Sequence, residues 1–488
     1  MKIAYSLKNA SILLLFLLLT IYALGEFLDA LPLYLWDESR QAVNAIEMYE
    51  NHNWLVTHYD NMPDMWNTKP PLLIWLQVAC MNLLGVTVTA VRLPSVMAAI
   101  ITTIVIFYFM KKNTGNIWIA FFSGIVLISM AGFNGFHVAR TGDYDSLLVL
   151  FSTLSVIQFY YYVDTLNKKY ILLFALFLCL GSLTKGVAAL LFLPGFFLYA
   201  LLQKKIISIL KDPFFYLSCI GYIFVVGLFY ISREHYNPGY LKAVYENELG
   251  GRYLKVTEGH DGTIFTYIKL LAYDQTFFWF DLFLVGMITY PFCTKIFKHE
   301  KVFYYFLILS ICFLAVISSS KTIISWYSAP ILPLLACICV LLLITMLTFL
   351  IQKIQFEFPL KSVLVLCIAG LIVLIGYLNI IQINRHPSYK YEWDKDFYRL
   401  STFFHENKYP VAKLNLKVID DTNLHQHLLF YMRRLRLSNV VIDFGDYKKL
   451  KKGDAVITDK EFISDYIKNN YSTTELYKED GVYLYHIN

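Results

Sequence analysis

The sequence carries little charge for its length. Only 16% of its 488 residues are charged, whereas 57% are hydrophobic and 17% are aromatic. A chain of this size with long apolar runs and so few charges is typical of a protein that crosses a membrane many times. The formal net charge is +6, which lysines on the cytoplasmic face explain better than a nucleic-acid-binding surface does. Nucleic acid is therefore not expected as a partner.

The sequence also lacks the patterns that mark metal sites and duplicated folds. Its eight cysteines form no CxxC pair, and no histidine stands at metal-ligand spacing. The cysteines lie within or beside apolar stretches, so we expect buried packing thiols. No internal repeat is evident. This counts against the main alternative function, a lipid or solute transporter, because transporters often have paired halves with broken helices near mid-membrane.

Eleven apolar windows are long enough, or nearly so, to cross about 30 Å of hydrocarbon. They are residues 11–29, 90–110, 117–136, 144–163, 170–183, 186–202, 213–231, 275–294, 302–318, 326–349 and 361–382. We expect the first window to remain as a span rather than to be removed as a signal peptide. A twelfth apolar segment, residues 70–86, opens with a Pro-Pro pair that suits the start of a helix in the interface or of a re-entrant segment.

Lysine clusters predict how these windows are oriented. Lys2 and Lys8, Lys111 and Lys112, Lys168 and Lys169, Lys204, Lys205 and Lys211, Lys295, Lys298 and Lys301, and Lys353 and Lys361 should all face the cytoplasm. They can do so together only if residues 70–86 do not cross. The N-terminus is then inside and the C-terminus outside, and the polar residues between the spans share the external side.

The composition changes near residue 384, where charged residues become more frequent and the apolar runs shorten. Residues 440–444, 455–458 and 482–486 have the pattern of strands, and residues 423–434 that of a helix. We therefore predict an all-α membrane domain over residues 1–383, with about eleven transmembrane helices, interfacial helices and a catalytic first external loop at 30–89. A small extracytoplasmic α/β domain should follow over 384–488.

Two acidic sites lie at the external ends of predicted spans. Asp37 and Glu38 open an amphipathic pattern that predicts an interfacial helix, so Asp37 could be a helix cap or a catalytic base. Asp143 and Asp145 stand at the mouth of the 144–163 window, where acidic residues also occur for helix-dipole reasons alone.

Basic and aromatic residues are predicted on the same side. Lys185 interrupts apolar sequence and is either a snorkelling lysine or the partner of an anion. Arg252 follows a Gly-Gly pair that would let a phosphate approach closely, although an ordinary solvated turn has the same composition. Lys321 and Tyr327 open another span, where aromatic belt residues are also common. With Lys69, this set suits a lipid-linked phosphate and a hydroxyl acceptor.

Several short motifs resemble the bacterial GT-C glycosyltransferases, which include lipid A aminoarabinose transferases and relatives of protein O-mannosyltransferases. The motifs are Trp36-Asp37-Glu38-Ser39-Arg40, Asn53-Trp54-Leu55-Val56-Thr57, Lys69-Pro70-Pro71-Leu72, Val91-Arg92-Leu93-Pro94-Ser95, Leu183-Thr184-Lys185-Gly186, and Ser320-Lys321-Thr322 followed by Trp326-Tyr327 and Pro330-Ile331-Leu332-Pro333. The resemblance covers roughly residues 10–340.

The resemblance implies a polyprenyl-monophosphate sugar as donor and a lipid, glycan or protein acceptor, at the external face of the bacterial inner membrane and among its lipids. The family's first-loop acidic residue falls on Asp37, its neighbouring arginine on Arg40, and its second-loop aspartate on Asp145, with Asp143 as the alternative. The phosphate-contacting positions fall on Lys69, Lys185, Arg252 and Tyr327. Glu38 and Lys321 are supporting residues.

One departure from the family concerns the acceptor side. Many relatives have Glu-Lys-Pro-Pro where this chain has Thr68-Lys69-Pro70-Pro71, so that glutamate is missing or replaced by Asn67, Asp64 or Glu248. No metal is required, because a monophosphate donor contains its own leaving group. A divalent cation held by Asp37, Asp143 and Asp145, as in oligosaccharyltransferase relatives, is the alternative.

Overall fold

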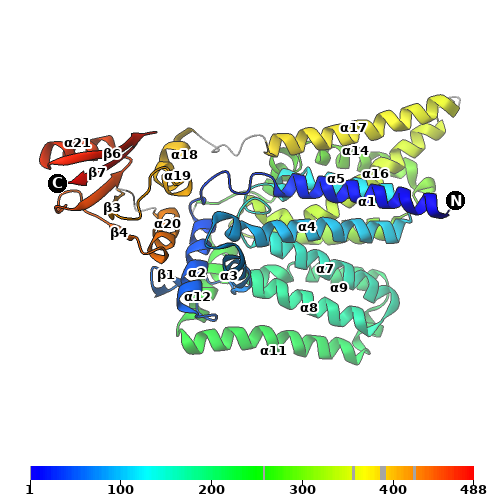
Figure 1. Ribbon diagram of the computed structural model, residues 1–488. Coiled ribbons are helices and arrows are strands. Elements are labelled where there is room, and N and C mark those ends of the chain that lie inside the picture. Colours follow the sequence, from blue (N-terminus) through cyan, green and yellow to red (C-terminus); the bar gives the residue numbers. More distant parts are fainter. Residues whose placement is uncertain (1, 257–258, 354–357, 385–391, 421, 423–424) are drawn as a thin grey trace. The chain divides into compact units, whose positions relative to one another are not determined.

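A computed structural model describes residues 2–256, 259–353, 358–384, 392–420, 422 and 425–488 (Figure 1). The chain divides into two compact units. The first, here called the membrane unit, comprises Met1–Glu26, Thr68–Leu73 and Arg92–Asn384. The second, the C-terminal unit, comprises Phe27–Asn67, Ile74–Val91 and Arg385–Asn488. The predicted first external loop, residues 30–89, therefore contributes most of its residues to the same unit as the end of the chain.

Among the described residues, six helical segments are long and apolar enough to cross a membrane. They are α4 (Val88–Thr114), α7 (Asp145–Thr165), α8 with η1 (Lys168–Lys185 and Gly186–Leu190), α11 (Pro213–Tyr236), α15 (Glu300–Ser318), and η5 with α16 (Ser325–Ile331 and Leu332–Lys353). A seventh is a helix pair, Thr266–Gln275 and Trp279–Ile296, bent by 120°. The protein is thus a multi-pass membrane protein, as the composition predicted.

The predicted count of eleven crossings is not confirmed by helix length and composition. The other four windows coincide with α1 (Lys2–Gly25), α5 (Ile117–Ile128), α9 (Leu193–Leu202) and α17 (Phe358–Asn384). Among the described residues, the apolar stretches of these helices are Asn9–Gly25, Ile117–Ile128, Leu193–Leu202 and Ala369–Ile383, each of 10–17 residues. The ambiguous segment 70–86 forms α3 (Leu72–Leu84), a helix of 13 residues, which at 1.5 Å per residue spans only about 20 Å.

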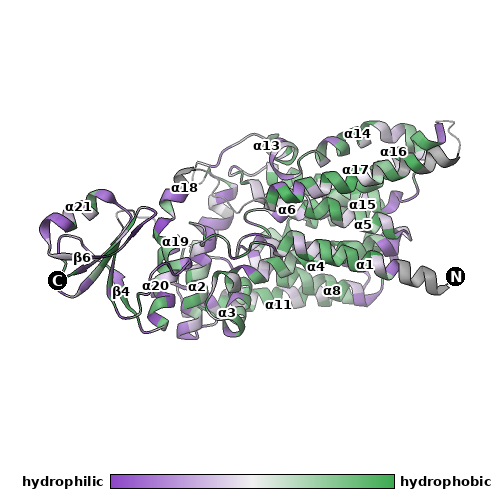
Figure 2. Ribbon diagram, turned by 45° about the horizontal axis from the view of Figure 1, so that its top comes forward, coloured by the Kyte–Doolittle hydropathy of each residue, from purple (hydrophilic) through white to green (hydrophobic). Residues whose placement is uncertain are grey.

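Short helical segments connect the spans of the membrane unit. They are α6 (Ala131–Asn134), α10 (Ile206–Leu210), α12 (Tyr240–Val244) and η2 (Tyr245–Tyr253). The bent helix pair consists of α13 (Thr266–Leu270) and η3 (Leu271–Gln275), followed by α14 (Trp279–Cys293) and η4 (Thr294–Ile296). Most of the helices of this unit are hydrophobic along their length (Figure 2). Their close packing is visible at Gly286, where a Cβ atom would lie 2.8 Å from Leu342, so α14 and α16 approach closely only because this position is glycine.

The C-terminal unit contains a five-stranded sheet in the order β4-β3-β5-β7-β6. Its strands are β3 (Asn415–Ile419), β4 (Val441–Phe444), β5 (Asp454–Thr458), β6 (Thr473–Glu479) and β7 (Val482–Ile487). The first three strands are mutually parallel, and β7 pairs antiparallel with both β5 and β6. Helices α18 (Glu392–Phe397), α19 (Arg399–His405), α20 (Gln426–Leu437) and α21 (Glu461–Asn470) complete this fold.

Three strands and one helix were predicted here, and all are present. The helix begins at Gln426, while position 423 of the predicted range lies outside the described residues. Strands β3 and β6 were not predicted from the sequence. The β6 strand is largely exposed, so it lacks the apolar run that identified its neighbours.

Helix α2 (Asp37–Asn51) is amphipathic, as predicted, but its apolar residues contact protein. Val43 and Ile46 join Leu416 of β3 and Leu428 of α20 in one buried core. Arg433 of α20 also forms ion pairs of 2.8 Å with Glu47 and with Glu50 of α2. A tiny hairpin, β1 (His58–Tyr59) with β2 (Met62–Pro63), follows α2. These contacts tie the start of the first loop to the C-terminal fold.

The prediction that all eight cysteines are buried was wrong for two of them. All eight are free thiols, but Cys219 and Cys367 are exposed, whereas Cys80 and Cys312 are half-buried and the other four are buried. Both exposed thiols lie on apolar helices, α11 and α17. A cysteine on the lipid-facing side of a span has the same apolar neighbours in sequence as one in the core, so sequence alone did not distinguish them.

Candidate functional site

The predicted site residues fall in both units. Seven lie in the membrane unit, and Asp37, Glu38 and Arg40 lie in the C-terminal unit. Within the membrane unit, five of the seven gather at the start of α7, at the end of α8, and on the segments that precede α3 and follow α11 and α15. Those five are Lys69, Asp145, Lys185, Arg252 and Tyr327. Asp143 and Lys321 make other contacts.

Lys185 and Asp145 form a buried ion pair. Lys185 ends α8, Asp145 begins α7, and the ammonium nitrogen Nζ lies 2.6 and 2.7 Å from the two carboxylate oxygens. The ammonium group also lies over the ring of Tyr327, 4.9 Å from its centre, where the negative face of the ring adds attraction. Because both oxygens of Asp145 already contact Lys185, Asp145 is poorly placed to serve as a metal ligand or as a base.

Lys69 faces Glu248, which was predicted only as one possible replacement for the glutamate that many relatives have before this lysine. Its Nζ atom is 3.5 Å from Oε1 of Glu248, and the Thr68 hydroxyl donates to the same oxygen over 3.5 Å. The Tyr240 hydroxyl donates to the backbone oxygen of Thr68 over 2.6 Å, which fixes this stretch of chain. Glu248 thus places a carboxylate beside Thr68 and Lys69, where many relatives carry a glutamate in sequence.

Glu248 and Arg252 lie on the same short π-helix, η2. π-Helices are rare in proteins and occur often at functional sites. The guanidinium group of Arg252 donates to the Tyr327 hydroxyl over 2.7 Å. The backbone oxygen of Arg252 accepts from the Ser320 hydroxyl and from the Thr322 amide, over 3.0 and 3.1 Å. The segment before η5 therefore holds η2 in place through main-chain contacts.

Two cavities open beside these side chains. One, of about 240 Å³, is lined by Lys69, Lys185 and Glu248 together with apolar and tyrosine side chains of η1 and α11. The other, of about 110 Å³, is lined by Asp145, Arg252 and Tyr327, with apolar side chains from α15. Lys185 and Glu248 line both cavities. Both cavities therefore combine apolar walls with a shared polar end, an arrangement that suits a lipid with an anionic head.

The electrostatic potential at the shared polar end of the two cavities favours a negative charge. Burial raises the pKa of the Glu248 carboxyl group, but the charges of Lys69, Arg252 and Lys185 outweigh burial, so its pKa lies below the ordinary value. A carboxylate kept ionised by three cations indicates a positive potential at its position. An anionic ligand would experience the same potential.

Asp143 and Lys321 lie apart from these contacts. Asp143 is buried and accepts a hydrogen bond from the Thr141 hydroxyl, and its Oδ2 atom is 3.4 Å from Nδ1 of His137. The His137 ring stacks on Trp326 with 3.5 Å between ring centres. Lys321 is exposed, and its backbone amide donates to the Tyr253 oxygen. Its observed contact is therefore structural.

The C-terminal unit holds the other predicted residues. Asp37 is the first residue of α2 and is half-buried, and the N-cap position is taken by Trp36. Glu38 is buried and accepts from the Tyr34 amide over 2.8 Å. Arg40 forms a two-point ion pair of 2.9 and 2.8 Å with Asp64. Burial raises the Asp64 pKa, but the bonds from Arg40, from Asn44 and from the backbone outweigh it and lower the pKa overall.

Glu248, Asp64 and His137 were not predicted as site residues. Glu248 and Asp64 could be named only as candidates, because they lie far along the chain from Lys69 and Arg40, respectively. His137 gave no signal, since a lone histidine before a span is more often structural than functional. The Glu246-Asn247-Glu248 sequence before the Gly-Gly pair was the only available hint.

Comparisons with known proteins find similarity to glycosyltransferases that use lipid-phosphate sugars. Residues 68–231 match the model of the family described as dolichyl-phosphate-mannose-protein mannosyltransferase. The chain is also 26% identical over 203 residues to the undecaprenyl phosphate-alpha-4-amino-4-deoxy-L-arabinose arabinosyl transferase of Aeromonas hydrophila. That alignment covers 40% of this chain and 36% of the relative, so it spans little more than a third of the relative's length.

Solved structures extend the likeness to nearly the whole chain. ArnT from Cupriavidus metallidurans bound to undecaprenyl phosphate superposes with a TM-score of 0.70 at 14% identity, covering 97% of each chain. The apo oligosaccharyltransferase of Archaeoglobus fulgidus gives a TM-score of 0.52 at 9% identity, covering 98% of this chain and 74% of that one. At these identities the likeness shows a shared fold.

Proposed function

We propose that this multi-pass membrane protein, a glycosyltransferase of the GT-C superfamily by its motifs, family match and fold, transfers a sugar from a polyprenyl monophosphate to an acceptor hydroxyl. The reaction takes place at the extracytoplasmic face of the bacterial inner membrane. The acceptor is a lipid A, glycan or protein group. The ArnT structure that shares this fold is bound to undecaprenyl phosphate, which is the donor class that we assign here.

The observation that carries this proposal is the cationic end shared by two apolar cavities. Lys69, Lys185 and Arg252, with the Tyr327 hydroxyl, supply the donors that a phosphate monoester needs. A guanidinium group can bind two phosphate oxygens at once. The apolar side chains of η1, α11 and α15 that line the cavities provide a path for the polyprenyl tail.

In the proposed mechanism Asp37 acts as the general base. It removes the proton of the acceptor hydroxyl while the oxygen attacks the anomeric carbon with inversion, and the lipid phosphate leaves with the bonding electron pair. Lys69, Lys185, Arg252 and Tyr327 stabilise the negative charge that develops on the leaving phosphate. Asp145 holds Lys185 in position through their ion pair. Arg40 and Glu38 shape the start of α2 beside Asp37.

The proposed reaction needs no bound divalent cation. Three cationic side chains already surround the phosphate subsite, and the ammonium group of Lys185 occupies both oxygens of Asp145. Transfer should therefore continue in excess chelator. Loss of transfer on chelation, with recovery on adding back a divalent cation, would assign a metal to the site instead.

The direct test is transfer by purified protein carrying Asp37→Asn. General-base assistance is typically worth about 10²- to 10⁴-fold, so the variant should fold and bind donor normally but transfer sugar slower by that factor. Arg252→Gln should instead raise the donor KM, because it removes a phosphate contact. Glu246→Gln, an exposed change on the same loop, is the matched control. Parental rates in Asp37→Asn would remove Asp37 as the base.

The substrates can be identified in cells. Mass spectrometry of membrane lipids and surface glycans, with and without the gene, should show one sugar missing from the acceptor and its lipid-phosphate form accumulating. Movement of substrate across the membrane without any glycosylated product would instead support a transporter.

A further inference from the structure

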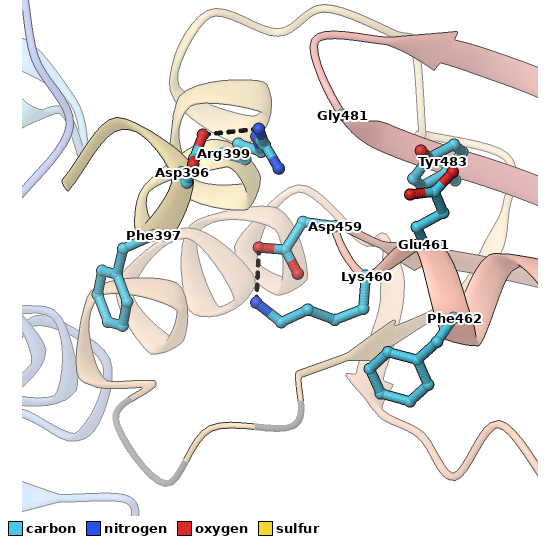
Figure 3. Close-up of a pocket in the computed structure, with 9 residues that line it drawn as sticks. All are labelled: Asp396, Phe397, Arg399, Asp459, Lys460, Glu461, Phe462, Gly481 and Tyr483. Atoms are coloured by element: carbon cyan, nitrogen blue, oxygen red, sulfur yellow. Dashed lines mark hydrogen bonds and ion pairs between the residues drawn. The ribbon is translucent and has the colours of Figure 1, made fainter. Parts of the chain in front are cut away.

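A third cavity lies within the C-terminal unit. It has a volume of about 590 Å³, which is in the range of small-ligand sites. Its walls come from α18 and α19, from the segment joining β5 to α21, and from the β6–β7 turn (Figure 3). All three walls lie in one compact unit, so the cavity is defined without reference to the membrane unit.

The cavity contains a buried carboxylate that the fold does not satisfy. Asp459 is 7% exposed, and among the described residues its Oδ1 atom has no hydrogen-bond partner. Its Oδ2 atom accepts from Lys460 over 3.3 Å. It is not the cap of α21, because the N-cap residue is Lys460 and no side chain caps that helix. Buried polar atoms without a partner are rare and usually have a functional cause.

The location of Asp459 in the sheet is also that of a binding site. Asp459 follows β5, and Asp420 follows the adjacent parallel strand β3, one step beyond the paired residues Ile419 and Thr458. The chain leaves β3 through α20 toward β4 at one edge, and leaves β5 through α21 toward β6 at the other. Ligands of open α/β sheets bind outside the carboxyl ends of strands where the connections diverge in this way.

The side chains around Asp459 indicate which kind of ligand the cavity suits. Phe397, Phe462 and Tyr483 line the cavity, and Figure 3 shows Asp459 between Phe397 on one side and Tyr483 on the other. The Phe397 ring packs on His427, with 4.9 Å between ring centres, which limits its motion. Aromatic faces combined with a charged hydrogen-bond acceptor suit a ligand with both C–H faces and hydroxyl donors.

The charges of the cavity disfavour an anion. Its acidic side chains are Asp396, Asp459 and Glu461, and its basic ones are Arg399 and Lys460. Arg399 is paired with Asp396 over 2.6 Å. It also lies against Gly481, where a Cβ would come within 2.7 Å of the guanidinium carbon. Both basic groups are thus already neutralised, so phosphate or sulfate would find a surplus of negative charge.

We propose that this cavity is a saccharide-binding site in which Asp459 Oδ1 accepts a hydrogen bond from a sugar hydroxyl, while Phe397, Phe462 and Tyr483 contact the C–H faces of the ring. The inference does not depend on the transfer reaction proposed above, because it concerns a different unit and can be tested without a donor.

The test uses the full-length protein in lipid nanodiscs prepared without sugar detergents or glycolipids, which would compete. Saturation-transfer NMR is recorded with methyl glycosides of glucose, mannose, galactose and N-acetylglucosamine. At least one glycoside should receive saturation from the protein. A hydrogen bond to a charged group is roughly 1 kcal/mol stronger than one to a neutral group, so Asp459→Asn, which keeps an acceptor oxygen but removes its charge, should weaken binding by about fivefold.

Two further variants separate binding from folding. Phe462 is exposed, so Phe462→Ala should preserve the fold yet also weaken glycoside binding. Asp465→Asn makes the same chemical change as Asp459→Asn at an exposed position of α21 and should bind as the parent does. Absence of saturation transfer to all four glycosides, or equal binding by the parent and Phe462→Ala, would overturn the proposal.

Discussion

Lys185 shows at the scale of one residue how the membrane unit holds a charge among apolar helices. Its ammonium group contacts both oxygens of Asp145 and the ring of Tyr327. A buried charge is tolerated only when it is paired, and removal of one partner leaves the other uncompensated. Asp145 and Lys185 should therefore behave as one unit in mutagenesis.

A double-mutant cycle tests this pairing. Asp145→Asn should lower the free energy of unfolding by about 3–5 kcal/mol, because it leaves Lys185 buried without a counter-charge. Adding Lys185→Met should restore most of that stability without restoring sugar transfer, since the phosphate contact is also lost. Thermal unfolding in detergent gives the first result, and a transfer assay gives the second. Stability losses that simply add would show that the two side chains act independently.

Asp64 provides the clearest pH dependence. Its pKa in the folded protein lies below the ordinary value, so its stabilising effect is fully present above the unfolded-state pKa of about 3.9 and is lost as pH falls through the lower folded-state pKa. Asp64→Asn should lower the melting temperature at pH 7 and flatten its decline below about pH 4. Melting curves between pH 7 and 3 measure this. Asp465→Asn, at an exposed position of α21, should leave both unchanged.

At the scale of elements, the nine-residue π-helix η2 positions two charged residues of the candidate site. It carries Glu248 toward Lys69 and Arg252 toward Tyr327. Its glycine pair permits this winding. A Cβ at Gly251 would overlap the carbonyl oxygen of Glu246, and one at Gly250 would lie 2.8 Å from the Tyr245 ring.

Gly251→Ala should therefore unwind η2 and displace Arg252. We expect the donor KM to rise more than kcat falls, because phosphate binding is lost while Asp37 is unchanged. Gly227→Ala is the matched control, since no atom lies within 4 Å of a Cβ at that position in α11 and alanine favours a helix. Equal KM values for parent and Gly251→Ala would show that η2 geometry is not needed for donor binding.

For the whole molecule, sequence patterns predicted the parts that rest on local signals. The apolar windows located the long spans, and short apolar runs located β4, β5 and β7. They did not identify the shared core of α2 and α20, because Val43 and Leu428 are far apart in sequence and meet only through tertiary packing. The same limit applied to the site. Lys185 and Arg252 were predicted from local motifs, whereas Glu248 becomes a partner of Lys69 only in the folded chain.

The predicted orientation of the whole chain can be tested by labelling. Lys242 and Lys204 are both exposed, and the lysine clusters place them on opposite sides of the membrane. In a parent with Cys219 and Cys367 replaced by serine, Lys242→Cys should react with an impermeant maleimide in intact spheroplasts. Lys204→Cys should react only after permeabilisation. Labelling of both from the same side would contradict the predicted topology.

The cationic end shared by the two cavities has a kinetic consequence. The phosphate would be held by Lys69, Lys185, Arg252 and Tyr327. This phosphate is present both in the sugar-loaded donor and in the polyprenyl phosphate that remains after transfer. The spent polyprenyl phosphate should therefore compete with fresh substrate for the same contacts, and its departure should limit turnover. An enzyme built in this way slows when recycling of its carrier stalls, so its output follows the supply of the lipid as well as that of the sugar.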